Sequence, residues 1–448
     1  MVHTAPTETV AAEQPVAHGR TLVRSTLSGT FGTALEYYDF VIYGLAAATV
    51  FNALFFPEVS PTIGLLASFA TYSVGFFARP VGGLILGALG DRIGRKAILV
   101  FTIVAMGLST FAIGLLPTHA QIGIWAPLLL LLLRITQGFG AGAELASAST
   151  LLVESAPPPR RGLLGSLVCI GTNTGTLVAS GVWLTVTMLP EDAFMSWGWR
   201  LPFLVSIGIA AWGLWIRRRV QESPTFTEVA SEQQHKKFTE IYGGVITGGR
   251  KAFLSCFGLR IGEAGTSILY QVFLVGYIAT LPGVDASTGT LAVVVASLVG
   301  YVTIPLVGYL IDKVGRRPVF RWLSGFQLAF AFPGIYLVNT GNTALILTAF
   351  ILAFSTAVLG MYAIESAWMA EIFGSHHRLA GVTAAKELGG VLGGGIAPMV
   401  ASALTAAFVD HWWPIAAYVA LLAGVSFVSS LYAPETKGRN LLHRNDAI

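Results

Sequence analysis

Two carboxylates stand close together in an apolar stretch near the start of the chain. Glu36 and Asp39 are three residues apart, which predicts that they share one face of a helix, with Tyr38 beside them as a candidate substrate contact. Two carboxylates in a medium of low dielectric constant cannot both ionise comfortably, so one of them tends to hold a proton. This spacing predicts a group that loads and releases a proton, preferably Asp39. The alternative is a structural anchor paired to an arginine of a neighbouring helix.

Arginines in other apolar stretches are candidate partners for an acidic group. Arg134 can bind a carboxylate through two parallel hydrogen bonds. We expect a substrate to supply that carboxylate, and the alternative is a permanent ion pair with Asp39 or Glu36. Arg79 precedes Pro80, which loosens or kinks a helix. We expect Arg79 to pair at a cytoplasmic gate, and substrate contact is the alternative.

A further charged pair lies in the second half of the chain. Arg260 and Glu263 have the spacing of neighbours on one helical face. A mutual salt bridge is one interpretation. The other is that both residues line a substrate cavity together with Tyr270 and Gln271.

Three more charged residues lie further along the chain, and one lies shortly after Arg134. Lys386, Glu387 and Glu365 form either a charge-neutral cytoplasmic gate or, in the sharper hypothesis, a site where Lys386 binds a substrate carboxylate. Glu144 is expected either on a proton path or in a hydrogen bond between helices.

The histidines and cysteines do not form a metal site. The histidines of the connecting segments lack metal-ligand spacing, and two cysteines within apolar segments favour neither a disulfide framework nor a metal centre. There is no nucleophile triad, P-loop or dinucleotide fingerprint in the required strand context, so no catalytic residue and no cofactor is expected. The small positive net charge falls in short clusters between apolar runs, which does not indicate nucleic-acid binding.

The elements that must hold these side chains are long apolar helices. Of 448 residues, 54% are hydrophobic and 11% charged, whereas a soluble domain carries about 25% charged residues. The solvent of such a chain must be lipid, and a segment crossing lipid pairs its backbone groups internally as a helix of about 20 residues. The apolar runs predict an all-α membrane protein with spans at residues 26–54, 62–88, 97–117, 123–153, 163–188, 201–218, 252–280, 288–311, 318–338, 343–370, 380–407 and 414–432.

The charges of the connecting loops predict an orientation. Lys and Arg gather in one set of loops and Asp and Glu in the other, so the positive-inside rule places both termini in the cytoplasm of a cell-membrane protein. We expect a disordered tail at 1–24, a six-helix bundle at 25–219, a cytoplasmic linker at 220–251, a second bundle at 252–433 and a tail at 434–448.

The two halves of the chain resemble each other. GALGDRIGRK follows the second span and GYLIDKVGRR follows the eighth, 221 residues further on, with Gly, Asp, Gly and a basic pair in register. A duplicated six-helix unit predicts two pseudo-symmetric bundles about a central site. We expect the glycines to allow tight turns and the acidic groups to bind helix N-termini or arginines as a conformational switch. The proposed gating residues are Gly87, Asp91, Arg92, Gly94 and Arg95, then Gly308, Asp312, Gly315 and Arg316, and also Glu154, Glu371 and Arg378.

Several of these motifs resemble a known family. The GALGDRIGRK loop and Arg-Ile-Thr-Gln-Gly at 134–138 are similar to signatures of the major facilitator superfamily. LEYYDF at 35–40, FARPVGG at 77–83, WGWRLPF at 197–203, RRVQESP at 218–224 and the triple glycine at 393–395 resemble its metabolite:H+ symporter branch, whose members carry α-ketoglutarate, citrate, shikimate, proline or betaine. Ala143, Leu145, Lys386 and Glu387 depart from the pattern of that branch, which leaves room for another substrate.

The sequence is therefore interpreted as a proton symporter rather than an enzyme. We expect it to import a small organic acid or zwitterion by alternating access, with the proton on Asp39 or Glu36 and the substrate carboxylate at Arg134 with Arg79 or Lys386. Its expected partners are substrate, protons and the lipid bilayer, and it is expected to work as a monomer. A proton-coupled exporter is the alternative, although the fifth span lacks the proline of exporters, and a transporter-like sensor is a weaker one.

Overall fold

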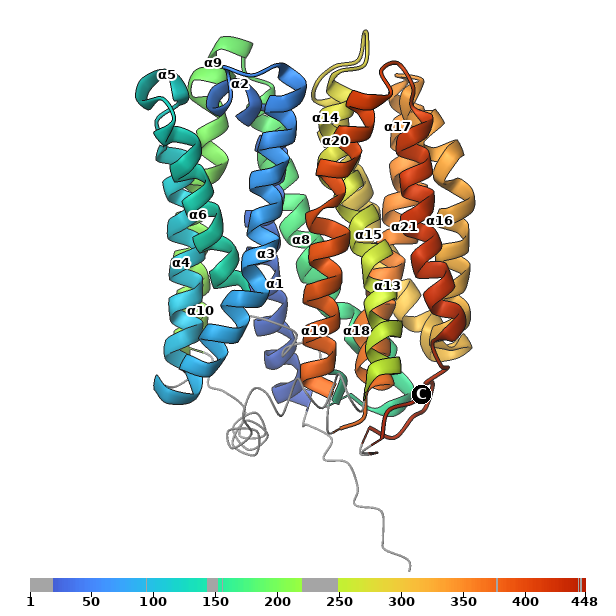
Figure 1. Ribbon diagram of the computed structural model, residues 1–448. Coiled ribbons are helices and arrows are strands. Elements are labelled where there is room, and N and C mark those ends of the chain that lie inside the picture. The colour runs from blue at the N-terminus through green and yellow to red at the C-terminus, as the bar shows by residue number, and fades with distance from the viewer. Residues whose placement is uncertain are drawn as a thin grey trace, which may run out of the picture.

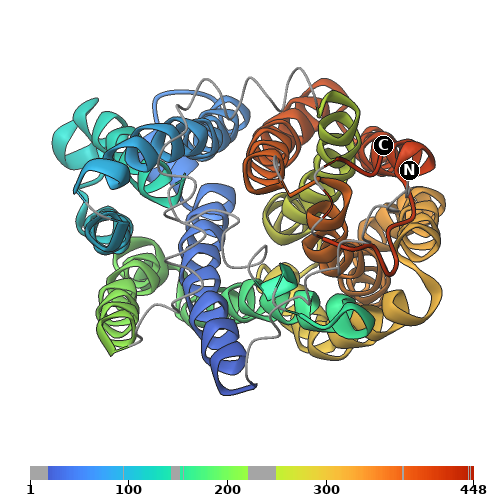
Figure 2. The same cartoon turned by 90° about the horizontal axis from the view of Figure 1, so that it is seen from below.

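The computed structural model describes residues 19–93, 95–142, 152–154, 156–219, 249–375, 378–441, 443 and 445–448. These segments contain helices and no strand. The long helices run side by side in two groups, one formed by the first half of the chain and one by the second (Figure 1). Seen from below, the groups are distinct and meet along a seam (Figure 2).

Six long helices belong to the described part of the first bundle. Short helices α2 (Phe51–Phe55), α5 (His119–Ile122) and α9 (Glu191–Ser196) occupy connections at the end remote from the C-terminus (Figure 1). The six long helices are α1 (Gly19–Thr49), α3 (Pro61–Ile93), α4 (Arg95–Leu115), α6 (Trp125–Ala141), α8 (Arg161–Thr187) and α10 (Leu201–Arg219).

The second bundle, within residues 249–375 and 378–441, also has six helical stretches, three of which contain a π-helical segment. Such segments widen a helix locally and are frequent at functional sites. The stretches are α13 (Arg250–Ile268) continuing through Leu269–Phe273 into α14 (Leu274–Ala279), α15 (Thr288–Val314), α16 (Arg316–Asn339), α17 (Thr343–Ala349) continuing through Phe350–Val358 into α18 (Leu359–Ile372), α19 (Arg378–Gly390) continuing through Val391–Gly395 into α20 (Ala397–Ala407), and α21 (Trp413–Tyr432).

Each predicted span coincides with one of these helices. In the described part of the chain, seven helical stretches are long and apolar enough to cross a membrane, and three more are shorter and apolar. The first helix begins at Gly19, earlier than the predicted 26. The described part of the fourth ends at Ala141, and the rest of that predicted span is outside the described residues apart from 142 and 152–153.

Close contact between α3 and α6 places two of the candidate arginines. A methyl group added to Gly138 would collide with the carbonyl of Gly75, and one added to Gly142 would collide with the carbonyl of Arg79. Glycines on one helix therefore let the backbones touch, as is common in membrane helices. This close contact fixes the position of α3, which carries Arg79, relative to α6, which carries Arg134.

The predicted tight turns at Gly87 and Gly308 are wrong. Gly87 lies inside α3, and Gly308 lies inside α15, where an added methyl group would collide with Ser166 of α8. Gly308 therefore serves the close packing of the two bundles. The turn comes later, at Gly315, whose φ of 118° favours glycine.

Candidate functional site

A small cavity lies between the two bundles. Its volume is about 50 Å³, room for about three waters, whereas sites for drug-sized ligands occupy about 300–1,000 Å³. A metabolite can therefore enter only if the bundles move apart. The first bundle lines it with Tyr37, Phe40, Val41, Phe76 and Arg79, and the second with Arg260, Glu263, Ala264, Ser267, Ile268, Lys386, Glu387, Gly390 and Gly394.

Arg79 joins the two bundles at this cavity. Its Nη1 lies 2.5 Å from Oε1 of Glu36 on α1. On its other side, Nε donates to Oε2 of Glu387 at 2.9 Å and Nη2 donates to Oε1 at 3.1 Å, so the pair with α19 is bidentate. All three side chains are largely buried, with 14% of Arg79, 11% of Glu36 and 9% of Glu387 exposed. One guanidinium thus holds two carboxylates, one from each bundle.

A second charged group belongs to the other side of the cavity. Arg260 forms a salt bridge with Glu263 of the same helix, and its Nη1 lies 3.3 Å from Oε2 of Glu365 on α18. Lys386 of α19 also lines the cavity and interacts electrostatically with Arg260 and both carboxylates. Arg260 and Glu263 therefore form the expected salt bridge and also line the cavity, although Tyr270 and Gln271 do not line it with them.

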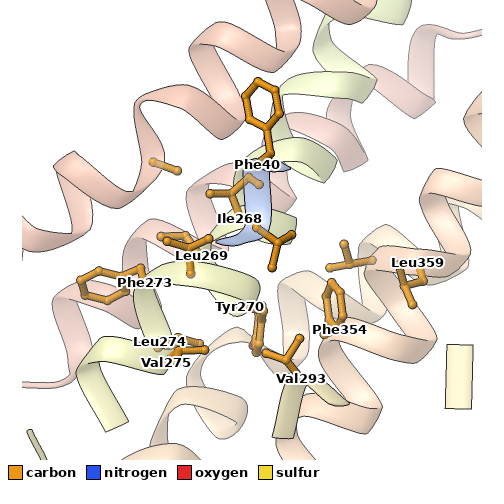
Figure 3. Packing of buried hydrophobic residues seen from close by; sticks show 14 of the residues in the cluster. Phe40, Ile268, Leu269, Tyr270, Phe273, Leu274, Val275, Val293, Phe354 and Leu359 are labelled. Atoms are coloured by element: carbon orange, nitrogen blue, oxygen red, sulfur yellow. The ribbon is translucent and has the colours of Figure 1, made fainter. Parts of the chain in front are cut away.

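The first bundle contributes the aromatic part of the lining. The guanidinium carbon of Arg79 lies 5.0 Å from the centre of the Phe40 ring, and the rings of Phe40 and Phe76 meet edge to face at 5.0 Å. Figure 3 shows Phe40 of α1 next to Ile268 of the second bundle, and both residues line the cavity. The cavity therefore offers an apolar, ring-lined wall opposite a charged one.

Arg134 lies behind this wall rather than in the cavity. Its side chain is fully buried, and the guanidinium carbon lies 4.1 to 4.9 Å from the ring centres of Phe40, Tyr43 and Tyr72. Nη1 donates to the side chain of Gln137 at 2.5 Å. Arg134 is not among the residues that line this cavity, whereas Phe40, whose ring lies against its guanidinium, is. The predicted contact between Arg134 and a substrate stays a prediction.

Asp39 and Glu36 do not share a site. Asp39 lines a small hollow formed with residues of α4 and α10 and interacts electrostatically with Thr110 and Arg134. Gln137 in turn donates to Thr110 at 2.7 Å, so Arg134, Gln137, Thr110 and Asp39 form one polar chain inside the first bundle. Both residues lie on α1, three positions apart, but Glu36 pairs with Arg79, so the two carboxylates have different partners.

Three further predicted contacts lie away from the cavity lining. The hydroxyl of Tyr38 donates to the carbonyl of Pro202 at 2.7 Å within the first bundle. Tyr270 is buried in the second bundle with its ring against Phe350. Gln271 accepts from Thr176 of α8 at 3.0 Å, which places it at the interface of the bundles. Glu144 lies outside the described residues.

The bundles are also joined near the end of the molecule where the C-terminus lies (Figure 1). Asp312, at the end of α15, accepts from the backbone N–H groups of Gly162 and Leu163 at 2.8 and 2.9 Å. These groups belong to the first turn of α8, where a helix carries partial positive charge. This is the helix-terminus contact predicted for Asp312.

Arginines surround that contact. Arg316 binds Glu371 bidentately at 2.9 and 3.0 Å, and its Nη2 lies 3.3 Å from Asp312. Arg378 reaches across to Glu154 of the first bundle at 2.7 Å. In the equivalent region of the first repeat, Gly94 lies outside the described residues, and of Asp91, Arg92 and Arg95 only the helical backbone is described.

Two features at the bundle interface were missed in the sequence. On α8, Thr172, Asn173 and Thr174 bond to Tyr362, the carbonyl of Ser297 and Tyr301 across the interface. The run GTNTGT at 171–176, polar within an apolar span, could have signalled this. The chain after α21 also contacts the gate: Thr436 donates to Glu371 at 2.6 Å, and the carbonyl of Arg439 accepts from Arg161 at 2.9 Å.

Comparison with known proteins links this architecture to transport. Residues 29–357 match the model of the Major Facilitator Superfamily. The chain is 39% identical to YdfJ of Escherichia coli K12, over 91% of this chain and 96% of that protein. It is 37% identical to the shikimate transporter of the same organism, over 90% and 91%. It is 32% identical to the proline/betaine transporter of Salmonella typhimurium LT2, over 94% and 85%.

A solved structure has the same fold. The crystal structure of a D-xylose-proton symporter superposes with a TM-score of 0.70 at 20% identity, covering 94% of this chain and 99% of that one. At this identity the likeness concerns the fold alone.

Proposed function

This chain belongs to the Major Facilitator Superfamily and is a membrane transporter, not an enzyme, and we propose that it imports a small organic acid or zwitterionic metabolite together with protons. The observation that carries this proposal is the inter-bundle cavity, in which an aromatic wall faces cations paired with carboxylates. Charged groups inside a membrane protein are costly and mark transport pathways. A carboxylate-bearing solute with an apolar body matches both walls. The names of the shikimate and proline/betaine relatives fit the same class.

Contacts on both sides of the cavity support alternating access. Toward the end of the molecule where the C-terminus lies, two contacts hold the bundles together. One is the ion pair of Arg79 with Glu387, and the other is the hydrogen bond that Asp312 accepts from the start of α8. Toward the other end, α1 lies directly against the second bundle, so that a methyl group added to Gly276 would meet Ala48 at 2.8 Å. A substrate is admitted from either side only after the contacts on that side separate. The two sets of contacts thus alternate as the bundles rock.

Two groups are proposed to hold the transported proton. Glu36 and Glu387 both pair with the guanidinium of Arg79, so this group has two negative charges and one positive charge. A single proton on one of the two carboxylates makes the group neutral. Asp39 ends the polar chain that begins at Arg134. We therefore assign Arg134 to the proton network and give the substrate carboxylate to Arg79 or Lys386, which line the cavity.

Localisation and assembly are part of the same proposal. We propose an inner-membrane location with both termini in the cytoplasm, because α8 and α19 begin at Arg161 and Arg378 at the end of the molecule where the C-terminus lies, whereas α9, which begins at Glu191, lies at the opposite end (Figure 1). We also propose that the transporter works as a monomer and without a cofactor, driven by the proton gradient. Export is the less favoured direction, since α8 carries no proline.

Uptake into proteoliposomes tests the proposal. Labelled α-ketoglutarate, citrate, shikimate, protocatechuate, proline and betaine would each be offered with and without an inward proton gradient. Accumulation of one compound that depends on the gradient is the expected result. Flat uptake of all six contradicts the proposed substrate class. Unchanged proton-driven uptake after joint replacement of Glu36 by Gln and Asp39 by Asn contradicts the proposed proton sites.

A further inference from the structure

Glu365 is a buried carboxylate that the proposed proton sites do not include. It lies on α18 and has no exposed surface. Its Oε2 lies 3.3 Å from Nη1 of Arg260, while its Oε1 makes no hydrogen bond in the described structure. A buried carboxylate oxygen without a donor is uncommon, because polar groups inside proteins are nearly always hydrogen-bonded. One oxygen of Glu365 is therefore available for a proton.

The groups that face Glu365 come from several helices. Its charged neighbours are Arg260 and Glu263 of α13 and Lys386 of α19, and the titratable groups near it are Cys169 of α8 and Cys256 of α13. Arg260 and Lys386 carry two positive charges, and Glu263 and Glu365 carry two negative ones. This group of four is neutral when all its members are ionised.

A substrate carboxylate upsets that balance. Arg260 and Lys386 both line the cavity, and Nε of Arg260 has no hydrogen-bond acceptor in the described structure, so its guanidinium still has a donor to offer. A carboxylate bound there adds a third negative charge to two cations inside the protein. A buried charge without a partner is strongly unfavourable. One proton on one of the two protein carboxylates restores neutrality.

We propose that Glu365 takes up this proton when a substrate carboxylate binds Arg260 and Lys386, so that the proton and the acid are carried together. This inference rests on the proposed function. Glu263 lines the cavity and shares a helix face with Arg260 in a direct salt bridge, whereas Glu365 lies behind Arg260 at a longer distance. When Arg260 turns to the substrate, Glu365 is the carboxylate that loses its cation.

The step is a plain proton transfer. An O–H bond forms on the Glu365 carboxyl with a proton that reached the cavity from the outer solution. When the bundles open to the cytoplasm and the substrate leaves, Arg260 returns to Glu365 and the O–H bond breaks, releasing the proton to that side. Each substrate carboxylate is therefore carried with one proton on Glu365, and the movement of these two charges together is electroneutral.

Replacement of Glu365 by Gln tests the proposal. Glutamine has the shape of the protonated acid but cannot release a proton. With the compound that the panel identifies, wild-type protein is expected to accumulate it about tenfold for each coupled proton at a gradient of one pH unit. The E365Q variant is expected to lose the part of this accumulation due to Glu365 and to keep exchange of labelled for unlabelled substrate without a gradient.

Glu191→Gln, in the short helix α9, is the matched control, because it makes the same change away from the cavity. Equal gradient-driven accumulation in E365Q and wild type overturns the proposal, as does a loss of coupling in Glu263→Gln but not in E365Q. If E365Q does not fold, Glu365→Asp replaces it, with the expectation that the pH profile of accumulation shifts in E365D but not in Glu191→Asp; unchanged profiles overturn the proposal. Failure of wild-type protein to accumulate any of the six compounds would instead refute the proposed function, and this inference with it.

Discussion

Arg79 and Glu387 connect the two bundles through a bidentate ion pair, with Nε 2.9 Å from Oε2 and Nη2 3.1 Å from Oε1. Because Arg79 also holds Glu36, the arginine stays paired within its own bundle if the bundles separate. The contact with Glu387 can therefore break and re-form without leaving Arg79 as an isolated buried charge. This makes the pair suitable as a reversible closure of the cavity.

Glu387→Gln is expected to open the cavity toward the cytoplasm. Hydrogen bonds to charged groups contribute about 1.5–3 kcal/mol, so their weakening should raise the open fraction by about tenfold. The measurement is the rate at which a thiol reagent labels Ser267→Cys, a cavity-lining position, from the cytoplasmic side after Cys169 and Cys256 are replaced by Ala. Glu191→Gln, in the short helix α9, controls for the loss of one charge. Equal labelling in E387Q and the parent protein would contradict the role of the pair.

Lysine replacements at Arg79 and Arg134 are expected to separate binding from coupling. Lysine cannot reproduce the planar fork of arginine. Arg79→Lys should raise the Kd for the substrate by about tenfold, because Arg79 lines the cavity. Arg134→Lys should leave the Kd near the wild-type value and abolish proton-driven accumulation, because Arg134 lies behind Phe40 in the polar chain to Asp39.

Equilibrium binding and gradient-driven uptake, measured on both variants, check this separation. If Arg134→Lys raises the Kd as much as Arg79→Lys does, Arg134 contacts the substrate, as the sequence alone had suggested.

The helices were predictable from the sequence, but the directions of the charged side chains were not. Long apolar runs can only be helices in lipid, so their number and approximate ends follow from hydropathy. Glu36 and Asp39, by contrast, are only about 60° apart around a helix, yet Glu36 pairs with the cavity-lining Arg79 and Asp39 lines a separate hollow. Which partner each carboxylate meets depends on the packing of α1 against its neighbouring helices, and no local pattern in the sequence encodes that packing.

Ion pairs between the two bundles could not be predicted from the sequence for a related reason. Arg79 and Glu387 are 308 positions apart, and several acidic groups were equally plausible partners for Arg79. The repeat pointed correctly to Asp312 as a helix-terminus ligand, because the contact depends on a loop motif. It misplaced the turn, since α15 continues through Gly308 to Val314.

Asp312→Asn is expected to weaken the closure at the end of the molecule where the C-terminus lies, the end that we propose faces the cytoplasm, and to slow uptake. The carboxylate of Asp312 accepts two backbone N–H groups at the start of α8, and a negative charge at a helix N-terminus contributes about 0.3–1 kcal/mol, up to about 2 when partly buried. The labelling rate of Ser267→Cys should therefore rise, and the maximal uptake rate should fall.

Asp285→Asn is the control for Asp312→Asn. Asp285 lies in an exposed loop, where hydrogen bonds from Ser287 lower its pKa. It is therefore ionised at neutral pH, and its replacement removes the same charge without touching the bundle interface. The same effect in both variants would mean that the net charge, and not the contact with α8, is responsible.

Gly138→Ala is expected to destabilise the first bundle, whereas Gly181→Ala is not. A methyl group at Gly138 would collide with the backbone of α3 at Gly75, while one at Gly181 on α8 would have no neighbour within 4 Å. Overpacking costs about 1–3 kcal/mol, and glycine to alanine in an open helical position stabilises by up to about 1 kcal/mol. The apparent Tm of the protein in detergent should therefore fall in the first variant and stay level or rise in the second. Since the same contact sets the positions of Arg79 and Arg134, Gly138→Ala should also reduce uptake, and a stable, fully active Gly138→Ala variant would show that the two helices need not touch.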